Sequence, residues 1–158
     1  MPKRGNRLTT EQLVAEAEIR QLVARFTDAA NRADYDLFRT VWTDTAVWEF
    51  KAPMAMIAHG ADEIVESLRK LLGPREFFVH LVHDGIIEVA TETAKARWYI
   101  REMARNKDGK VFYQNVGLYQ DEIVKTAEGW RFAKRSYHYI WLNEEPFGGR
   151  AIPLDASL

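Results

Sequence analysis

The chain has no cysteine among its 158 residues. This absence excludes disulfide bonds, cysteine-based zinc sites and a thiol nucleophile. An excess of charge of one sign is also missing, since 22 Lys and Arg face 23 Asp and Glu, for a net charge of −1. Such a balance gives no long-range field that attracts nucleic acid or an anionic membrane surface. We therefore expect neither nucleic acid nor a membrane among its partners.

Long apolar runs and several common motifs are absent as well. No run can span a bilayer, and the N-terminal MPKRGNRLTTEQ has basic residues without the apolar segment of a secretory signal. We expect a soluble cytoplasmic protein. The sequence also has no Gly-rich phosphate loop after a strand, no G-x-S-x-G elbow and no spacing that supplies three convergent metal ligands. The predicted site therefore has no metal and no cofactor.

What is present fits one domain. The chain is 47% hydrophobic and 28% charged, and its composition does not shift along its length. We expect a single domain over residues 1–158, with a core of about 8–142 and a tail of 143–158. The tail contains Gly148, Gly149 and Pro153, so it cannot continue a sheet. We expect it to wrap over an opening or a neighbouring subunit.

Apolar residues at steps of three and four predict three helices. The first begins at Thr9-Thr10-Glu11-Gln12, which has the spacing of a capping box, and runs to about Ala30. The second is short, starts after Asp34 as N-cap and buries side chains as far as Trp42. The third runs over residues 62–72 and ends at Gly73-Pro74.

Six strands are predicted. Residues 46–50 and a short edge strand at 54–59 precede the third helix, and four longer strands follow at 77–89, 94–104, 111–124 and 130–141. Asp108-Gly109 and Glu128-Gly129 are turn dipeptides between the last three. Consecutive hairpins indicate an antiparallel meander. Helices followed by such a sheet predict an α+β fold with the helices on one face.

His80 lies in an apolar, β-prone run, FFVHLVHDGIIEV. Alternation in a strand puts Phe78, His80, Val82 and Asp84 on one face and His83 on the other, which argues against a histidine metal pair. A single inward imidazole can exchange a proton near neutral pH, so His80 is a candidate base. The alternative is a core histidine bonded to a backbone carbonyl.

Glu102 is the second candidate catalytic residue. Trp98, Ile100, Glu102 and Ala104 share one face of the next strand, where an unpaired carboxylate is costly. Glu102 either orients His80 or forms an ion pair with a nearby arginine, Arg135 or Arg101.

The last strand supplies the third candidate. Arg135, Tyr137, Tyr139 and Trp141 alternate onto one face. An arginine beside phenols can hold a substrate oxygen or stabilise an enolate, although aromatic stripes more often only pack. Asn31 could donate to a substrate oxygen or could simply cap a helix. The candidate substrate-binding residues are Asn31, Tyr119, Tyr137, Tyr139, Phe26 and Trp98.

Five segments, in order, resemble one family: EIRQLVARF, NRADYDLFRTVWTDTAVWEF, VHLVHDGIIEV, ARWYIRE and GLYQDEIVKTAEGWRFAKRSY. They are similar to the SnoaL-like branch of the nuclear transport factor 2-like superfamily. The resemblance implies a cystatin-like cone, in which a curved antiparallel sheet wraps around three helices and leaves an apolar pocket. It also implies cofactor-free proton transfer on hydrophobic, usually cyclic molecules.

The resemblance also assigns positions. His80 matches the strand histidine that dehydratase and dehydrochlorinase members use as base, Glu102 matches an acidic position, and Arg135 matches a pocket arginine. Where the dehydratases pair the histidine with an aspartate, this chain has Asn31. An amide cannot stabilise an imidazolium as a carboxylate does, so Glu102 is the residue that could take over this role.

Two other positions differ from the dehydratases. Phe26 stands where they have a tyrosine or lysine, and Tyr139 replaces an arginine.

The expected function is a cofactor-independent lyase or isomerase for a small hydrophobic cyclic or aromatic substrate. Dehydratase-type elimination is the favoured reaction, with His80 as base, Glu102 as its support and Arg135 at the oxyanion. The alternatives are a non-catalytic binding domain and a structural small subunit of a ring-hydroxylating dioxygenase. The exposed face of a single cone predicts a homodimer or homotrimer.

Overall fold

The computed structural model describes residues 7–155 and 157. Residues 1–6 of the N-terminal segment and residues 156 and 158 of the expected tail therefore lie outside the described part. Three helices and six strands follow one another in the order α1 (Thr10–Arg32), α2 (Tyr35–Thr40), β1 (Trp42–Phe50), β2 (Ile57–His59), α3 (Ala61–Leu72), β3 (Arg75–Val89), β4 (Thr93–Asn106), β5 (Phe112–Thr126) and β6 (Gly129–Asn143).

Helix α1 begins with the expected capping box. The side chain of Thr9 accepts a hydrogen bond from the backbone N–H of Gln12, and the Gln12 side chain accepts one from the backbone of Thr9. The helix ends at Ala33, which has a left-handed backbone, and Asp34 then caps α2 by accepting from the backbone N–H of Leu37. The apolar stripe of α1 faces the sheet and is buried at Ala15, Ile19, Leu22, Val23, Phe26, Ala29 and Ala30.

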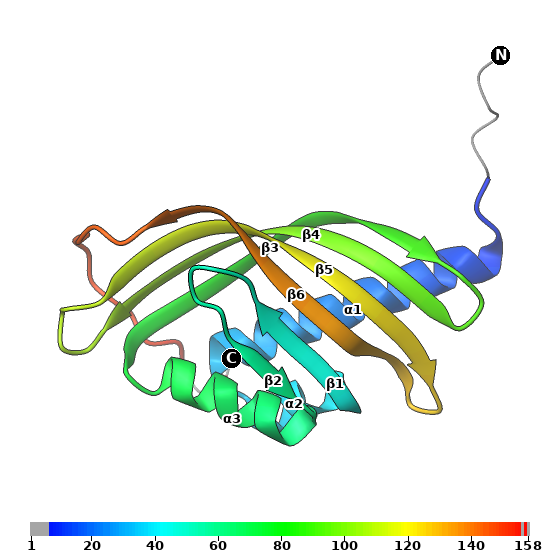
Figure 1. Ribbon diagram of the computed structural model, residues 1–158, viewed down its shortest axis with the longest axis horizontal. Coiled ribbons are helices and arrows are strands. Elements are labelled where there is room, and N and C mark those ends of the chain that lie inside the picture. Colours follow the sequence, from blue (N-terminus) through cyan, green and yellow to red (C-terminus); the bar gives the residue numbers. More distant parts are fainter. Residues whose placement is uncertain (1–6, 156, 158) are drawn as a thin grey trace, which may run out of the picture.

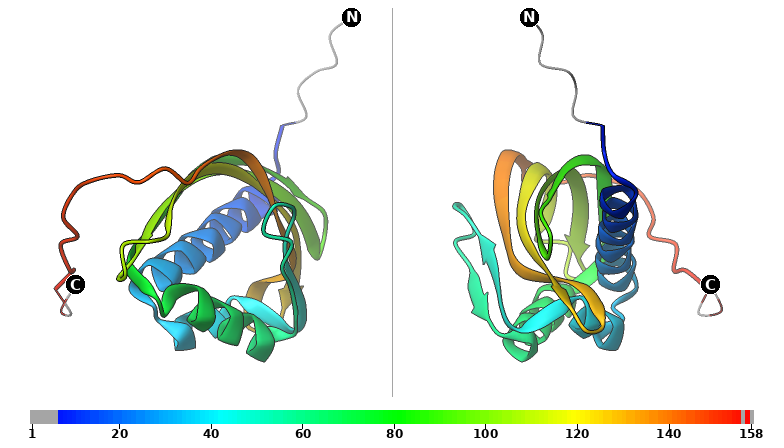
Figure 2. Two further views of the ribbon diagram at one scale, coloured as in Figure 1. Left: turned by 60° about the vertical axis from the view of Figure 1, so that its left-hand side comes forward. Right: turned by 90° about the vertical axis from the view of Figure 1, so that its right-hand side faces the viewer.

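The six strands form one curved sheet in the order β2-β1-β6-β5-β4-β3. The meander from β3 to β6 is antiparallel, as expected, but β1 runs parallel to β6, so the sheet is mixed. Figures 1 and 2 show the sheet arching over α1, with α2 and α3 at the open side of the arch. This is the cone predicted for the fold. Because β2 and β3 are the two ends of the strand order, the sheet is not closed.

Two element boundaries show how the structure differs from the prediction. Strand β1 begins at Trp42, which had been assigned to the second helix, because α2 ends at Thr40 and Val41 is its C-cap. Helix α3 starts at Ala61, one residue earlier than expected, and Gly60 precedes it without a side-chain cap. In both cases the apolar pattern runs across the boundary, so it does not reveal where the backbone changes.

Two bulges change which residues share a face. The pairing of β3 with β4 shifts between Val82 and Gly85, and Asp84 therefore points to solvent, 3.7 Å from the guanidinium of Arg20, instead of sharing the face of His80. The pairing of β5 with β6 shifts at Gly117, and Trp141 consequently points outward and is 51% exposed. Both residues had been predicted to point inward, because strict alternation cannot show an inserted residue.

The tail leaves the sheet after Asn143 and lies against the outside of one end of the sheet (Figure 2). Phe147 packs between the rings of Phe77 and Phe112, at centroid distances of 6.1 and 5.5 Å, and its carbonyl accepts a hydrogen bond from Arg105. Among the described residues, no helix is both long enough and apolar enough to cross a membrane.

Candidate active site

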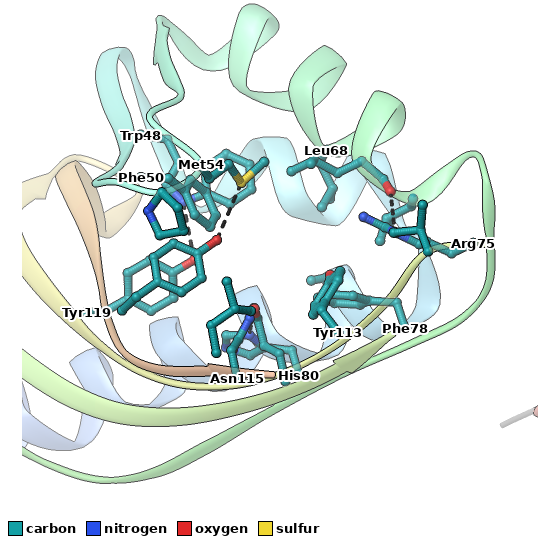
Figure 3. Close-up of a pocket in the computed structure, with 18 of the residues that line it drawn as sticks. Trp48, Phe50, Met54, Leu68, Arg75, Phe78, His80, Tyr113, Asn115 and Tyr119 are labelled. Atoms are coloured by element: carbon teal, nitrogen blue, oxygen red, sulfur yellow. Dashed lines mark hydrogen bonds and ion pairs between the residues drawn. The ribbon is translucent and has the colours of Figure 1, made fainter. Parts of the chain in front are cut away.

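A cavity of about 320 Å³ lies between the inner face of the sheet and the helices (Figure 3). Aromatic and aliphatic side chains make up most of its wall. They are Phe26, Ala30, Trp48, Phe50, Pro53, Met54, Leu68, Leu71, Leu72, Phe78, Val111 and Leu142. Polar groups interrupt this wall at His80, Glu102 and Asn115, and also at Arg75, Tyr113, Tyr119, Tyr139 and Glu144. A mostly apolar cavity with a few convergent polar groups is the usual form of a small-molecule site.

Three of these polar groups lie side by side because of strand register. His80 on β3 is directly opposite Glu102 on β4, and Glu102 is directly opposite Asn115 on β5. All three are inward positions and are buried, with exposed fractions of 1%, 6% and 2%. Neighbouring strands lie about 4.8 Å apart, so side chains at matched inward positions are within hydrogen-bonding reach.

Glu102 orients the imidazole of His80. The Nδ1 atom of His80 lies 2.7 Å from Oε1 of Glu102. A carboxylate only accepts hydrogen bonds, so Nδ1 carries the proton, and in neutral His80 the lone pair is on Nε2. Nε2 is buried and has no hydrogen-bond partner in the described part of the chain. A buried imidazole nitrogen without a partner, on a residue of the cavity wall, is suited to accept a proton from a ligand.

Asn115 and Tyr137 hold Glu102 in place. The amide of Asn115 donates from Nδ2 to Oε2 of Glu102 at 3.2 Å, and its Oδ1 accepts from the hydroxyl of Tyr137 at 2.7 Å. Because the tyrosine hydroxyl donates to the amide oxygen, the amide presents its N–H to Oε2 of Glu102, which accepts it. The result is a buried chain of hydrogen bonds from Tyr137 through Asn115 and Glu102 to His80.

Gly117 makes room for this chain. A Cβ at this position would lie 2.3 Å from the ring and hydroxyl of Tyr137 and 2.9 Å from the backbone oxygen of His138. The ring of Tyr137 therefore crosses β5 in the space that Gly117 leaves, and its hydroxyl reaches Asn115. Only glycine allows so close an approach.

Asn31 does not line the cavity. Its Oδ1 accepts from the backbone N–H of His80 at 2.7 Å, and its Nδ2 donates to the backbone oxygen of the same residue at 2.9 Å. Strand β3 is an edge strand, so these two backbone groups have no strand partner on that side. An amide satisfies both, whereas an aspartate could satisfy only the N–H. The structure thus gives Asn31 the role of fixing the strand at His80, and it is neither a helix cap nor placed to contact a substrate in the cavity.

Arg135 is also not a cavity residue, which corrects the prediction of a pocket-facing arginine. It is fully buried below the cavity, and its Nε and Nη2 donate to the two oxygens of Asp121 at 2.9 and 3.1 Å. Its guanidinium lies between three aromatic rings, with centroids 4.1 to 4.2 Å away, at Phe26, Tyr119 and Phe132. The remaining nitrogen, Nη1, is buried without a hydrogen-bond partner in the described part of the chain. Arg135 is not among the residues that line the cavity.

Among the described residues, Asp121 is the one carboxylate that forms an ion pair with Arg135. Burial raises the pKa of Asp121, and the guanidinium of Arg135 opposes that rise. Because Arg135 pairs with Asp121, it is not the partner of Glu102.

The remaining candidates divide into two groups. Phe26, Tyr119 and Tyr139 line the cavity, as expected for substrate-binding residues. Trp98 is buried in the core and Tyr137 lies under the cavity wall, so neither is among the lining residues. Their inward position had been predicted correctly, but the cavity ends before it reaches them.

Sequence reasoning missed Asn115, Arg75 and Tyr113. Asn115 could have been found, because it is a polar residue two positions before Gly117 on an alternating strand and faces inward. Arg75 and Tyr113 gave no such signal, since both lie near strand ends where the pattern is weakest.

Comparison with known proteins gives the family. Residues 11–136 match the model of the SnoaL-like domain. Among curated proteins, the uncharacterised protein Rv2910c of Mycobacterium tuberculosis is 25% identical over 132 residues, which cover 81% of this chain and 87% of that protein.

Solved structures agree on the fold. Hexachlorocyclohexane dehydrochlorinase LinA type 3 from Novosphingobium barchaimii has a TM-score of 0.77 at 14% identity and covers 92% of this chain and 98% of its own. The Kfla4162 protein from Kribbella flavida has a TM-score of 0.77 at 24% identity, with 83% and 94% covered. Identities this low establish a shared fold and leave the reaction open. Since the family model spans most of the sequence, the chain belongs to the SnoaL-like domain family.

Proposed function

We propose that the protein is a cofactor-independent lyase or isomerase that removes a proton from a small hydrophobic cyclic or aromatic substrate. One observation carries the proposal: a buried histidine on the cavity wall whose Nδ1 is held by a carboxylate and whose Nε2 has no partner in the described residues. The predominantly apolar wall suits a ring compound. Proteins of similar fold include a dehydrochlorinase, which supports the reaction class.

The proposed reaction is an elimination. Nε2 of His80 takes a proton from a substrate carbon, and the C–H electron pair becomes the new C=C bond. The leaving group departs from the adjacent carbon with its own electron pair, and a hydroxyl leaves as water after the imidazolium returns the proton to it. Glu102 stabilises the imidazolium between these two steps. If the proton returns to a different carbon, the same residues catalyse an isomerisation.

Phenols take the place that had been predicted for Arg135. Tyr113, Tyr119 and Tyr139 line the cavity, and burial raises the pKa of each, so they remain hydrogen-bond donors at neutral pH. A neutral phenol can donate to an oxyanion that forms when a proton is removed next to a carbonyl.

The proposal is tested by turnover. Hydroxylated, halogenated and keto ring compounds are incubated in D₂O, and loss of water or hydrogen halide and uptake of deuterium are followed by mass spectrometry. For any compound that reacts, His80→Ala should slow turnover by a factor on the order of 10² to 10⁴. His83→Ala is the matched control, because His83 is exposed on the outer face. Wild-type turnover in His80→Ala would refute the mechanism.

A further inference from the structure

Arg75 places a positive charge on the cavity wall. It is the first residue of β3 and is partly buried. Its Nε donates to the backbone oxygen of Leu71 at 3.1 Å and its Nη1 to Oδ1 of Asn106 at 2.6 Å. Both acceptors are neutral, and no carboxylate of the described residues forms an ion pair with this guanidinium. The geometry fixes the side chain but leaves its charge without a partner.

Tyr113 provides a second donor next to this charge. The guanidinium of Arg75 lies 4.8 Å from the centroid of the Tyr113 ring. The Tyr113 hydroxyl has no hydrogen-bond partner within the described chain, and its side chain lines the cavity. In Figure 3, Tyr113 and Phe78 lie between His80 and Arg75. The cavity thus has a proton-accepting group at one place and a pair of donors at another, with an aromatic wall between them.

Among the described residues, one further charged side chain lines the cavity in addition to His80, Glu102 and Arg75. It is Glu144. It is exposed to solvent, and it does not approach Arg75 closely enough to form an ion pair. Water screens an exposed charge strongly, so Glu144 neutralises Arg75 only weakly. A ligand anion that excludes water from the cavity would interact with Arg75 more strongly than Glu144 does.

Building on the proposed function, we propose that Arg75 and Tyr113 form a carboxylate-binding subsite, and that the substrate is a ring compound carrying a carboxylate group. The guanidinium and the phenol donate to the carboxylate, while the ring lies along the apolar wall toward His80. The subsite then fixes which ring carbon faces the base. Removing either donor should weaken the binding of anionic ligands and leave the affinity for neutral ligands of the same shape unchanged.

Binding measurements test this subsite without any need for turnover. Isothermal titration compares 2-naphthoate with the neutral 2-naphthalenemethanol, which has the same ring system. The wild-type protein should bind the carboxylate tighter than the alcohol by roughly tenfold or more, as expected for a charge-assisted hydrogen bond. Arg75→Gln should remove this preference and leave the affinity for the alcohol within about twofold. Arg101→Gln, which removes an exposed arginine from the outer face, should keep the preference.

Two further variants make the result decisive. Tyr113→Phe should reduce the preference severalfold, and it provides a test should Arg75→Gln not fold. His80→Ala should retain the preference, so the subsite and the proposed proton abstraction can stand or fail separately. No preference in the wild-type protein, or a preference that survives both Arg75→Gln and Tyr113→Phe, would overturn the subsite.

Discussion

At the scale of single residues, the site depends on which side chains form hydrogen bonds with the imidazole and with the backbone of His80. The carboxylate is supplied by Glu102 from the neighbouring strand, while the helix position opposite His80 is an asparagine that binds the backbone. The two roles are therefore divided between two side chains: Glu102 sets the tautomer and Asn31 sets the position of the strand.

Glu102→Gln tests the first of these roles. The substituted amide keeps the size of the side chain but loses the negative charge that, in the proposed mechanism, stabilises the imidazolium and keeps the proton on Nδ1. We expect kcat to fall by a factor on the order of 10² with the far-UV circular dichroism unchanged. A Glu102→Gln protein that keeps wild-type kcat on a substrate that requires His80 would show that the carboxylate only fills space.

Asn31→Asp tests the second role. The new carboxylate would face the backbone oxygen of His80, where Asn31 now donates at 2.9 Å. We expect the free energy of unfolding to fall by about 1 to 3 kcal/mol, because a buried carbonyl loses its donor and faces a negative charge. Urea denaturation measures the difference. An unchanged or higher stability would mean that the two hydrogen bonds between Asn31 and the backbone of His80 do not explain why asparagine is present at this position.

How far the site could be predicted differs from residue to residue. His80 and Glu102 could be placed on one face from alternation, and the resemblance identified both. Arg135 was placed on the correct face as well, but face alone does not decide depth: a buried aspartate on the adjacent strand, Asp121, holds it below the cavity. Contacts of this kind depend on strand register, which a single sequence does not reveal.

At the scale of elements, the meander from β3 to β6 aligns the site. One inward position on each of β3, β4 and β5 supplies His80, Glu102 and Asn115, and β6 contributes Tyr137 across Gly117. The helices were predictable from capping and periodicity, and the hairpins from their turn dipeptides. The bulges and the parallel pairing of β1 with β6 could not be predicted from the sequence. An inserted residue, or a pairing between strands far apart in the chain, leaves no local pattern.

Gly117→Ala tests the alignment of β5 with β6. The added methyl group would lie 2.3 Å from Tyr137 and 2.9 Å from a backbone oxygen, so the ring and the strand both have to shift. We expect a loss of about 2 kcal/mol or more in the free energy of unfolding, measured by urea denaturation, since overpacking and a broken hydrogen bond add together.

Gly148→Ala is the control for this change. No atom lies within 4 Å of a Cβ at Gly148, so its stability should stay within about 0.5 kcal/mol of wild type. If both variants had the same stability, the close approach of Tyr137 would not matter to the fold.

At the scale of the whole molecule, four tyrosines point into the interior and share the effects of burial. Burial, followed by the charge of Glu102, raises the pKa of Tyr113, Tyr119, Tyr137 and Tyr139, in the last case to about 12. The unfolded chain releases these protons near its ordinary tyrosine pKa of about 10. The folded state therefore binds more protons than the unfolded state above that pH.

The sign of the pH dependence follows from this difference. Stability from the buried phenols is fully present below about pH 10 and is lost as the pH rises from there toward the folded-state values. We expect the urea midpoint to fall steeply between about pH 10 and 12, and Tyr139→Phe to fall less steeply. The chain has two further tyrosines, Tyr35 and the exposed Tyr99. Tyrosinate absorbance at about pH 10 that corresponds to more than two of the six tyrosines in the folded protein, without unfolding, would contradict the burial of these four groups.

The most direct test of the central claim is the tautomer of His80, measured by ¹⁵N–¹H long-range correlation NMR on protein with labelled histidine. The account predicts a neutral His80 with its proton on Nδ1, an unprotonated Nε2, and a loss of this fixed tautomer in Glu102→Gln. A proton on Nε2 in the wild-type protein would contradict it, because His80 would then have no lone pair to offer a substrate from that nitrogen.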